Sequence, residues 1–249
     1  MKLFTYIVNM AMDTHKRKFM EAQLQGIQNL DIHWLNAING KKLTDHQIEE
    51  SVDLNLFKSR IGREFTLPEI GCTLSHKKIY QDMCQRRLPI ALVLEDDTIL
   101  DEEHTDNILK IARMFLAHSK PLVILLNPDI RYYKSDLVKK GHNYTIYKMR
   151  EGVQTSGYLI NFAAAHLLCG FSEKIYYFAD DWALFLSKGL TLYGCVPHQI
   201  SLRYIESSIY DDIAKLLSPS KKSFLKKIQD IMIFRFKWIL GRRFSNRIW

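Results

Sequence analysis

The sequence predicts an α/β fold with a central mixed, mainly parallel sheet and a basic amphipathic C-terminal helical tail. The apolar segment 3–8 is typical of a buried strand, and a helix over 13–25, begun by Asp13 and ended by Gly26, follows it. A second strand, 31–38, comes next. Because neighbouring parallel strands need a crossover connection, this strand–helix–strand opening indicates a parallel sheet.

The next segments continue the alternation of helix and strand. Thr66 and Glu69 have the spacing of a capping box and Pro68 lies between them, which predicts a helix that begins here and runs through Arg86. An apolar strand at 90–94 follows. Beyond it we expect a helix at 103–118 and shorter strands at 121–126, 144–149 and 155–161.

Length and composition indicate one globular domain. The chain has 249 residues, 47% of them apolar and 25% charged, so it can bury one substantial core, and disorder or a collagen-like chain is excluded. We expect this domain over 1–212 and the tail over 213–249. Four separated cysteines without a CxxC pair argue against a disulfide framework and favour a reducing, cytoplasmic setting. The N-terminal apolar run is expected to be a strand rather than a signal peptide.

The positive charge is concentrated in the tail. The formal net charge is +8, yet residues 213–249 contain ten basic residues and one acid, so the first 212 residues are nearly neutral. Apolar residues in the tail recur at helical spacing beside Lys and Arg, which favours an interfacial helix on an anionic membrane surface. A helix packed on the body and a nucleic-acid-binding segment are the alternatives.

Three consecutive acids, Glu95, Asp96 and Asp97, directly follow the strand at 90–94. Ligand sites in open α/β sheets lie beyond the carboxyl ends of strands. Crowded carboxylates raise one another's pKa unless a cation lies between them, and Mg²⁺ or Mn²⁺ commonly shares oxygen ligands with a diphosphate. Glu95 and Asp97 are therefore candidate metal ligands. The alternative is a set of solvated acids at the positive end of the next helix.

A second acidic pair, Asp180 and Asp181, precedes Trp182 and an apolar run. One carboxylate can cap the helix predicted there, and the other can act as a general base. Trp182 offers a flat apolar surface on which a sugar ring could stack.

Cys72 and His76 are four residues apart on the predicted helix, so they share one face, as two metal ligands would. No second His or Cys follows at ligand spacing, and a core-facing Cys beside a hydrogen-bonded His is the expectation we favour over zinc. The chain has no GxxxxGK[ST], GxGxxG, HExxH or GxSxG motif, which disfavours P-loop, Rossmann, zincin and α/β-hydrolase functions.

An ordered set of motifs resembles glycosyltransferase family 25, the lipooligosaccharide galactosyltransferases and their collagen-modifying relatives. The likeness extends over about 1–212. The motifs are YIVNM followed by Arg17, AING at 37–40, EIGCTLSH at 69–76, ALVLEDDTIL at 91–100, QTSGYLIN at 154–161 and ESSI at 206–209.

The resemblance implies a GT-A-like nucleotide-sugar-binding fold and transfer of a hexose, most often galactose, from a UDP donor to a sugar hydroxyl with inversion. It implies that Glu95 and Asp97 bind Mn²⁺ or Mg²⁺, that Asp96 meets the ribose-diphosphate, and that Asp180 or Asp181 is the base. Further donor-binding candidates are Asn9, Arg17, His76, Thr155, Ser156, Gly157, Ser207 and Ser208. The family's usual NLD-R pattern is replaced at 9–12 by NMAM.

The expected acceptor is the saccharide of a lipooligosaccharide or lipopolysaccharide, at the inner face of a bacterial cytoplasmic membrane that the tail would contact. No nucleic-acid partner is expected. Two other functions stay open at this point: a catalytically inactive sugar-nucleotide or saccharide-binding protein of the same fold, and a nucleic-acid-binding protein acting through the tail.

Overall fold

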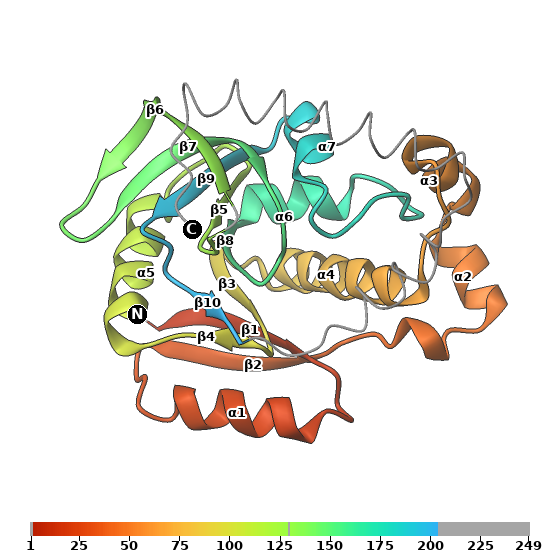
Figure 1. Ribbon diagram of the computed structural model, residues 1–249, viewed down its shortest axis with the longest axis horizontal. Helices are drawn as coiled ribbons and strands as arrows, with labels where there is room; N and C mark the ends of the chain where they lie inside the picture. The colour runs from red at the N-terminus through yellow and green to blue at the C-terminus, as the bar shows by residue number, and fades with distance from the viewer. Residues whose placement is uncertain (1, 129, 204–249) are drawn as a thin grey trace, which may run out of the picture.

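A computed structural model of the protein describes residues 2–128 and 130–203 (Figure 1). Ser207, Ser208 and the predicted tail lie outside the described residues. Within them, no helix combines the length and apolar character needed to cross a membrane.

The centre of the described fold is an eight-stranded sheet in the order β2-β1-β3-β8-β5-β9-β7-β6. The strands are β1 (Leu3–Asn9), β2 (Leu30–Asn36), β3 (Ile90–Glu95), β5 (Leu122–Leu125), β6 (Ile130–Lys140), β7 (Thr145–Gly152), β8 (Gly157–Asn161) and β9 (Thr191–Val196). Short strands β4 (Thr98–Ile99) and β10 (Ser201–Leu202) pair with each other.

The predicted α/β class is confirmed, but the prediction of a mainly parallel sheet is wrong. β1 pairs in parallel with β2 and β3, as the opening of the sequence indicates, and β5 pairs in parallel with β9. The four other pairings are antiparallel. The reason is that β8 inserts antiparallel between β3 and β5, and the β6–β7 hairpin extends the far edge.

Helices cover both faces of the sheet (Figure 1). Along β1, Tyr6 and Val8 face one core cluster while Leu3 and Ile7 face the other, as the alternation of a strand buried on both sides requires. One cluster includes residues of α1 (Thr14–Leu24) and α5 (Glu102–Phe115). The other includes residues of α4 (Leu67–Arg86), α6 (Phe162–Cys169) and α7 (Trp182–Ser187).

Several elements were not predicted from the sequence. They are η1 (Gly40–Lys42), α2 (Asp45–Ser51), α3 (Leu54–Ile61), α6, β4, β6, β9 and β10. Helix α2 contains one apolar residue, Ile48, so it carries almost no hydrophobic period, and α3 is only eight residues long and buries only Phe57.

Helix α4 begins at the predicted capping box. Thr66 Oγ1 accepts a hydrogen bond from the Glu69 amide, and the Glu69 carboxylate accepts one from the Thr66 amide. Gly71, one turn later, lets the helix approach the chain closely, because a Cβ atom there would lie 2.4 Å from the carbonyl oxygen of Ile38. The close approach at Gly71 places the amino-terminal half of α4 against the chain that follows β2.

The Thr66→Ala variant is expected to lose about 1 kcal/mol of unfolding free energy, because the Glu69 amide loses its acceptor, Thr66 Oγ1, and the Glu69 carboxylate loses the hydrogen bond that this hydroxyl donates. Thr66→Ser keeps the hydroxyl and is the matched control. Urea unfolding followed by circular dichroism measures the difference. Equal midpoints for the Ala and Ser variants would show that the capping box adds nothing to stability.

Candidate functional site

The acidic cluster, defined as Glu95, Asp96 and Asp97, lies at the carboxyl end of β3. Glu95 is the last residue of that strand, and its neighbour β1 ends at Asn9. The structure therefore brings together the ends of two parallel strands, which is where the sequence predicts a ligand site.

Each carboxylate oxygen of Asp96 has a hydrogen-bond partner from the N-terminal strand or helix. Asn9 donates from Nδ2 to one Asp96 oxygen at 2.8 Å, and Lys16 Nζ lies 2.9 Å from the other. Burial by itself would lower the pKa of Lys16, but the hydrogen bond and charge of Asp96 outweigh it and raise that pKa. Lys16 is thus a cation of the site that the sequence analysis missed.

Arg17, the basic residue that the sequence analysis placed in the donor site, is engaged elsewhere. Its Nε lies 3.0 Å from a Glu21 oxygen, and its guanidinium lies 4.4 Å from the centre of the Trp34 ring. Adjacent residues on a helix point in directions about 100° apart, so only Lys16 faces the acids. Lys16 is therefore the cation beside the cluster, and donor binding by Arg17 stays a prediction.

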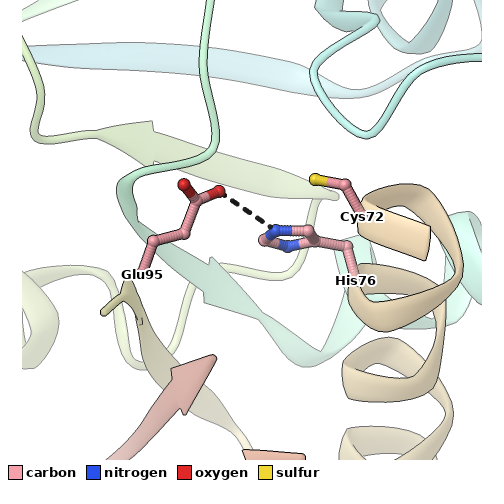
Figure 2. Close-up of side chains that lie close together, drawn as sticks. All are labelled: Cys72, His76 and Glu95. Atoms are coloured by element: carbon pink, nitrogen blue, oxygen red, sulfur yellow. Dashed lines mark ion pairs between the residues drawn. The ribbon is translucent and has the colours of Figure 1, made fainter. Parts of the chain in front are cut away.

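Glu95 is held by two neighbours on other elements. Thr155 Oγ1 donates a hydrogen bond to its carboxylate at 2.6 Å, and His76 Nε2 lies 3.5 Å from the same oxygen (Figure 2). Burial favours the neutral acid, but His76 and Thr155 together outweigh it and lower the pKa of Glu95. Glu95 is therefore ionised at neutral pH.

Asp97 is the least compensated member of the cluster. Its Oδ1 is buried and accepts no hydrogen bond from any described residue, and its Oδ2 lies 3.8 Å from Lys16 Nζ. Burial, with the charge of Glu95 adding to it, raises the pKa of Asp97 to about 6. A buried carboxylate oxygen without a partner beside a second carboxylate suits a hard divalent cation.

The raised pKa of Asp97 predicts a pH-dependent stability. Between its ordinary pKa and about 6 the folded protein binds more protons than the unfolded chain, so unfolding free energy falls as pH rises through this window. In chelator, Asp97→Asn is expected to raise Tm by several degrees at pH 7.5, because about 1 kcal/mol shifts Tm by about 2–4 °C at this size. The gain should shrink at pH 4.5.

Calorimetry at the two pH values measures this gain, with Asp106→Asn, an exposed acid of α5, as the control. A loss of Tm at pH 7.5 in Asp97→Asn would contradict the assignment of an uncompensated charge.

The second acidic pair separates into two different environments. Asp181 caps α7, accepting from the Leu184 amide at 3.4 Å, and it also forms an ion pair with Arg60. Asp180 accepts a hydrogen bond from the Gln154 amide at 2.9 Å. Burial raises the pKa of Asp180, and the charges of Glu95 and Asp181 raise it further. Asp180 is therefore the carboxylate suited to accept a proton.

Trp182 does not present a ring face to solvent. Its side chain is 0% exposed, its Nε1 donates to the Gln154 carbonyl at 3.2 Å, and its ring packs edge-on against Tyr158 and Phe185. The predicted acceptor-stacking role is corrected: Trp182 is a core residue, and its hydrogen bond positions the chain beside Asp180.

The remaining predicted donor residues have mainly structural contacts. His76 is buried and its Nδ1 lies 2.8 Å from the Tyr158 hydroxyl. The Ser156 carbonyl accepts from the Glu95 amide at 2.9 Å, which joins this segment to the end of β3. A Cβ atom on Gly157 would lie 2.2 Å from an Ile200 methyl carbon, so glycine there permits close packing.

A cleft of about 350 Å³ adjoins the ends of β1 and β2. It is lined by residues 10–12, which directly follow Asn9, by 36–39, and by Lys42, Leu43 and Gln47. The cleft therefore lies next to the end of β1, whose last residue, Asn9, contacts the acidic cluster. A ligand that binds at the acidic cluster could extend into this cleft.

Comparisons with known proteins identify the family of the chain. The model of the family described as "Glycosyltransferase family 25 (LPS biosynthesis protein)" matches residues 2–183. Procollagen galactosyltransferase 1-B of Xenopus laevis is 32% identical over 95 residues, 37% of this chain and 15% of that protein. Procollagen galactosyltransferase 2 of Homo sapiens is 26% identical over 88 residues, 34% and 14% of the two chains.

Two further similarities concern another relative and a solved structure. A glycosyltransferase 25 family member of Anopheles gambiae is 30% identical over 96 residues, 37% of this chain and 16% of that protein. Among solved structures, A197 from STIV matches with a TM-score of 0.42 and 9% identity, over 83% of this chain and 87% of that one.

The matched segment covers only about 15% of the length of each of these three relatives. Because the family model extends over most of the sequence, from the first strand to the start of α7, this chain belongs to glycosyltransferase family 25.

Proposed function

We propose that this glycosyltransferase moves galactose from UDP-galactose to a hydroxyl of a saccharide acceptor, with inversion at the anomeric carbon. The family and the galactosyltransferase names of its relatives support the reaction class. The observation that carries the proposal is the set of carboxylates from β3 and the start of α7, in which Asp97 has an uncompensated buried oxygen and Asp180 a raised pKa.

Glu95 and Asp97 would hold a divalent ion, Mn²⁺ or Mg²⁺. The fit rests on the chemistry of the donors, since both are carboxylates and the buried Asp97 Oδ1 receives no hydrogen bond from the described residues. When bound, such an ion would neutralise the charge that develops on the departing UDP. Asp96 is already compensated by Asn9 and Lys16, so it is left to position the donor rather than to bind the ion.

Asp180 would act as the general base. A single displacement with inversion needs a carboxylate on the acceptor side to take the proton of the attacking hydroxyl. A raised pKa makes Asp180 a stronger base than an ordinary aspartate, while the hydrogen bond from the Gln154 amide fixes its orientation. Asp181 is occupied by the cap of α7 and by Arg60.

The cleft at the ends of β1 and β2 would receive part of the nucleotide of a GT-A-like donor site. Asn9 directly precedes the cleft residues 10–12 and donates a hydrogen bond to Asp96. It would therefore fix the position of the acidic cluster relative to the cleft. The acceptor we propose is the saccharide of lipooligosaccharide or lipopolysaccharide, in keeping with the family description. The enzyme would then work in the cytoplasm at the inner membrane surface.

A donor screen tests the proposal. Release of UDP from several UDP-sugars is measured with de-acylated lipooligosaccharide fragments as acceptors, with Mn²⁺ and with chelator. We expect UDP-galactose to be the best donor, turnover to require the ion, and NMR to show a β-linked product. Absence of turnover for every UDP-sugar with the ion present would overturn the proposal.

A further inference from the structure

Cys72 and His76, both on α4, form a cluster with Glu95 at the end of β3 (Figure 2). The sulfur of Cys72, a ring nitrogen of His76 and a carboxylate oxygen of Glu95 all lie within 4.8 Å of one another. Two of these residues are one turn apart on α4, and the third comes from the end of β3. In a tetrahedral zinc site, neighbouring ligand atoms are about 3.5 Å apart, so small side-chain movements would close the cluster around an ion.

His76 is oriented as a metal ligand. Its side chain is 1% exposed, and its Nε2, which faces Glu95 at 3.5 Å, has no hydrogen-bond partner among the described residues. Its Nδ1 is held by the Tyr158 hydroxyl at 2.8 Å. Metal-ligating histidines commonly use the second ring nitrogen in this way, which fixes the ring and directs the other lone pair at the metal.

The other two ligands also have the required surroundings. Cys72 is half-buried, lies close to Glu95 and is exposed to the negative charges of Glu95 and Asp180, which a bound cation would offset. Thr155 donates to Glu95 at 2.6 Å and so orients the carboxylate that the ion would share. The 3.5 Å contact with Glu95 leaves the buried Nε2 of His76 without a hydrogen bond, and a metal ion between the two atoms would bind both.

We propose that Cys72, His76 and Glu95 bind a thiophilic divalent ion, with Zn²⁺ as the best fit and the fourth position open. Sulfur and imidazole ligands select zinc over Mg²⁺ or Mn²⁺, which prefer oxygen. Binding deprotonates the Cys72 thiol and releases its proton to solvent. This site and the proposed oxygen-ligand site have Glu95 in common and differ in their other ligands, Cys72 and His76 here and Asp97 there.

Cobalt binding tests the site directly, without nucleotide or acceptor. Co²⁺ added to the metal-free full-length chain is expected to give the visible bands of tetrahedral cobalt and a sulfur-to-cobalt charge-transfer band, which Zn²⁺ abolishes at one equivalent. Cys84→Ser, on the same helix, should retain both features. Cys72→Ser should lose the charge-transfer band, and His76→Gln should bind Co²⁺ at least about tenfold more weakly.

A second measurement needs no substitution and so does not depend on how the variants fold. Alkylation of each cysteine in the unmodified protein is followed by peptide mass spectrometry, and Zn²⁺ is expected to protect Cys72 while leaving the Cys84 rate unchanged. Absence of the charge-transfer band, or equal alkylation of Cys72 with and without Zn²⁺, would overturn the site.

The zinc site can be disproved independently of the proposed transferase function, because the cobalt and alkylation experiments measure metal binding without any substrate. If Glu95 also binds the oxygen-seeking ion of the proposed transfer reaction, Zn²⁺ should inhibit that reaction, and Cys72→Ser should weaken the inhibition. Transfer that is equally sensitive to Zn²⁺ in both proteins would place the inhibitory ion elsewhere and would count against this site.

Discussion

Asp180→Asn is expected to lower kcat for hexose transfer by about 10²–10⁴-fold, because an amide cannot take the proton of the acceptor hydroxyl. The amide oxygen of Asn can still accept the hydrogen bond from the Gln154 amide, so the local chain should keep its position. Donor affinity, measured by calorimetry with UDP, should change by less than about threefold, since the base acts on the acceptor. Steady-state release of UDP measures the loss of turnover.

Asp181→Asn is the matched control for this result. The amide oxygen of Asn can still cap α7, but the substitution breaks the ion pair with Arg60, so we expect a loss of at most about 1 kcal/mol in unfolding free energy. Turnover should fall much less than in Asp180→Asn. A larger loss of kcat in Asp181→Asn, with normal turnover in Asp180→Asn, would reverse the two roles.

Asp97→Asn is expected to reduce kcat/KM by at least about 100-fold and to abolish the stimulation of UDP binding by Mn²⁺. The reason is that Asp97 provides the buried carboxylate oxygen that no described residue satisfies. The same variant is expected to gain stability in chelator, so a loss of activity cannot be attributed to unfolding. Calorimetric titration of UDP with and without Mn²⁺ measures the effect.

Asp106→Asn removes an acid of equal charge from the exposed side of α5 and should leave both kcat/KM and the ion dependence unchanged. Retention of Mn²⁺-stimulated UDP binding in Asp97→Asn would show that this carboxylate is not a ligand. The ion would then have to be bound by ligands other than Asp97.

Local signals predicted much of the fold. Strands β1 and β3 are continuous apolar runs, and α4 starts at the capping box of Thr66 and Glu69, so neighbours in sequence are enough to define them. The sheet order could not be predicted in the same way. Strand β8 pairs with β3 and β5, and the direction of these pairings depends on segments far apart in the chain.

The sequence by itself determined which chemical groups the site contains: three acids after a buried strand, a second acidic pair before a helix, and a Cys and a His on one helix face. These patterns involve residues close together in the sequence, so they can be recognised without knowing the tertiary structure. Only the tertiary structure decided what each group contacts, because solvation and charge depend on neighbours from other elements.

Thus packing placed Lys16 rather than Arg17 beside the acids, and it used Asp181 as a cap while leaving Asp180 available. The spacing of Cys72 and His76 offered two ligand candidates and no third. Glu95 joins them because β3 ends beside the face of α4 that carries them, a proximity that arises when the helix packs on the sheet.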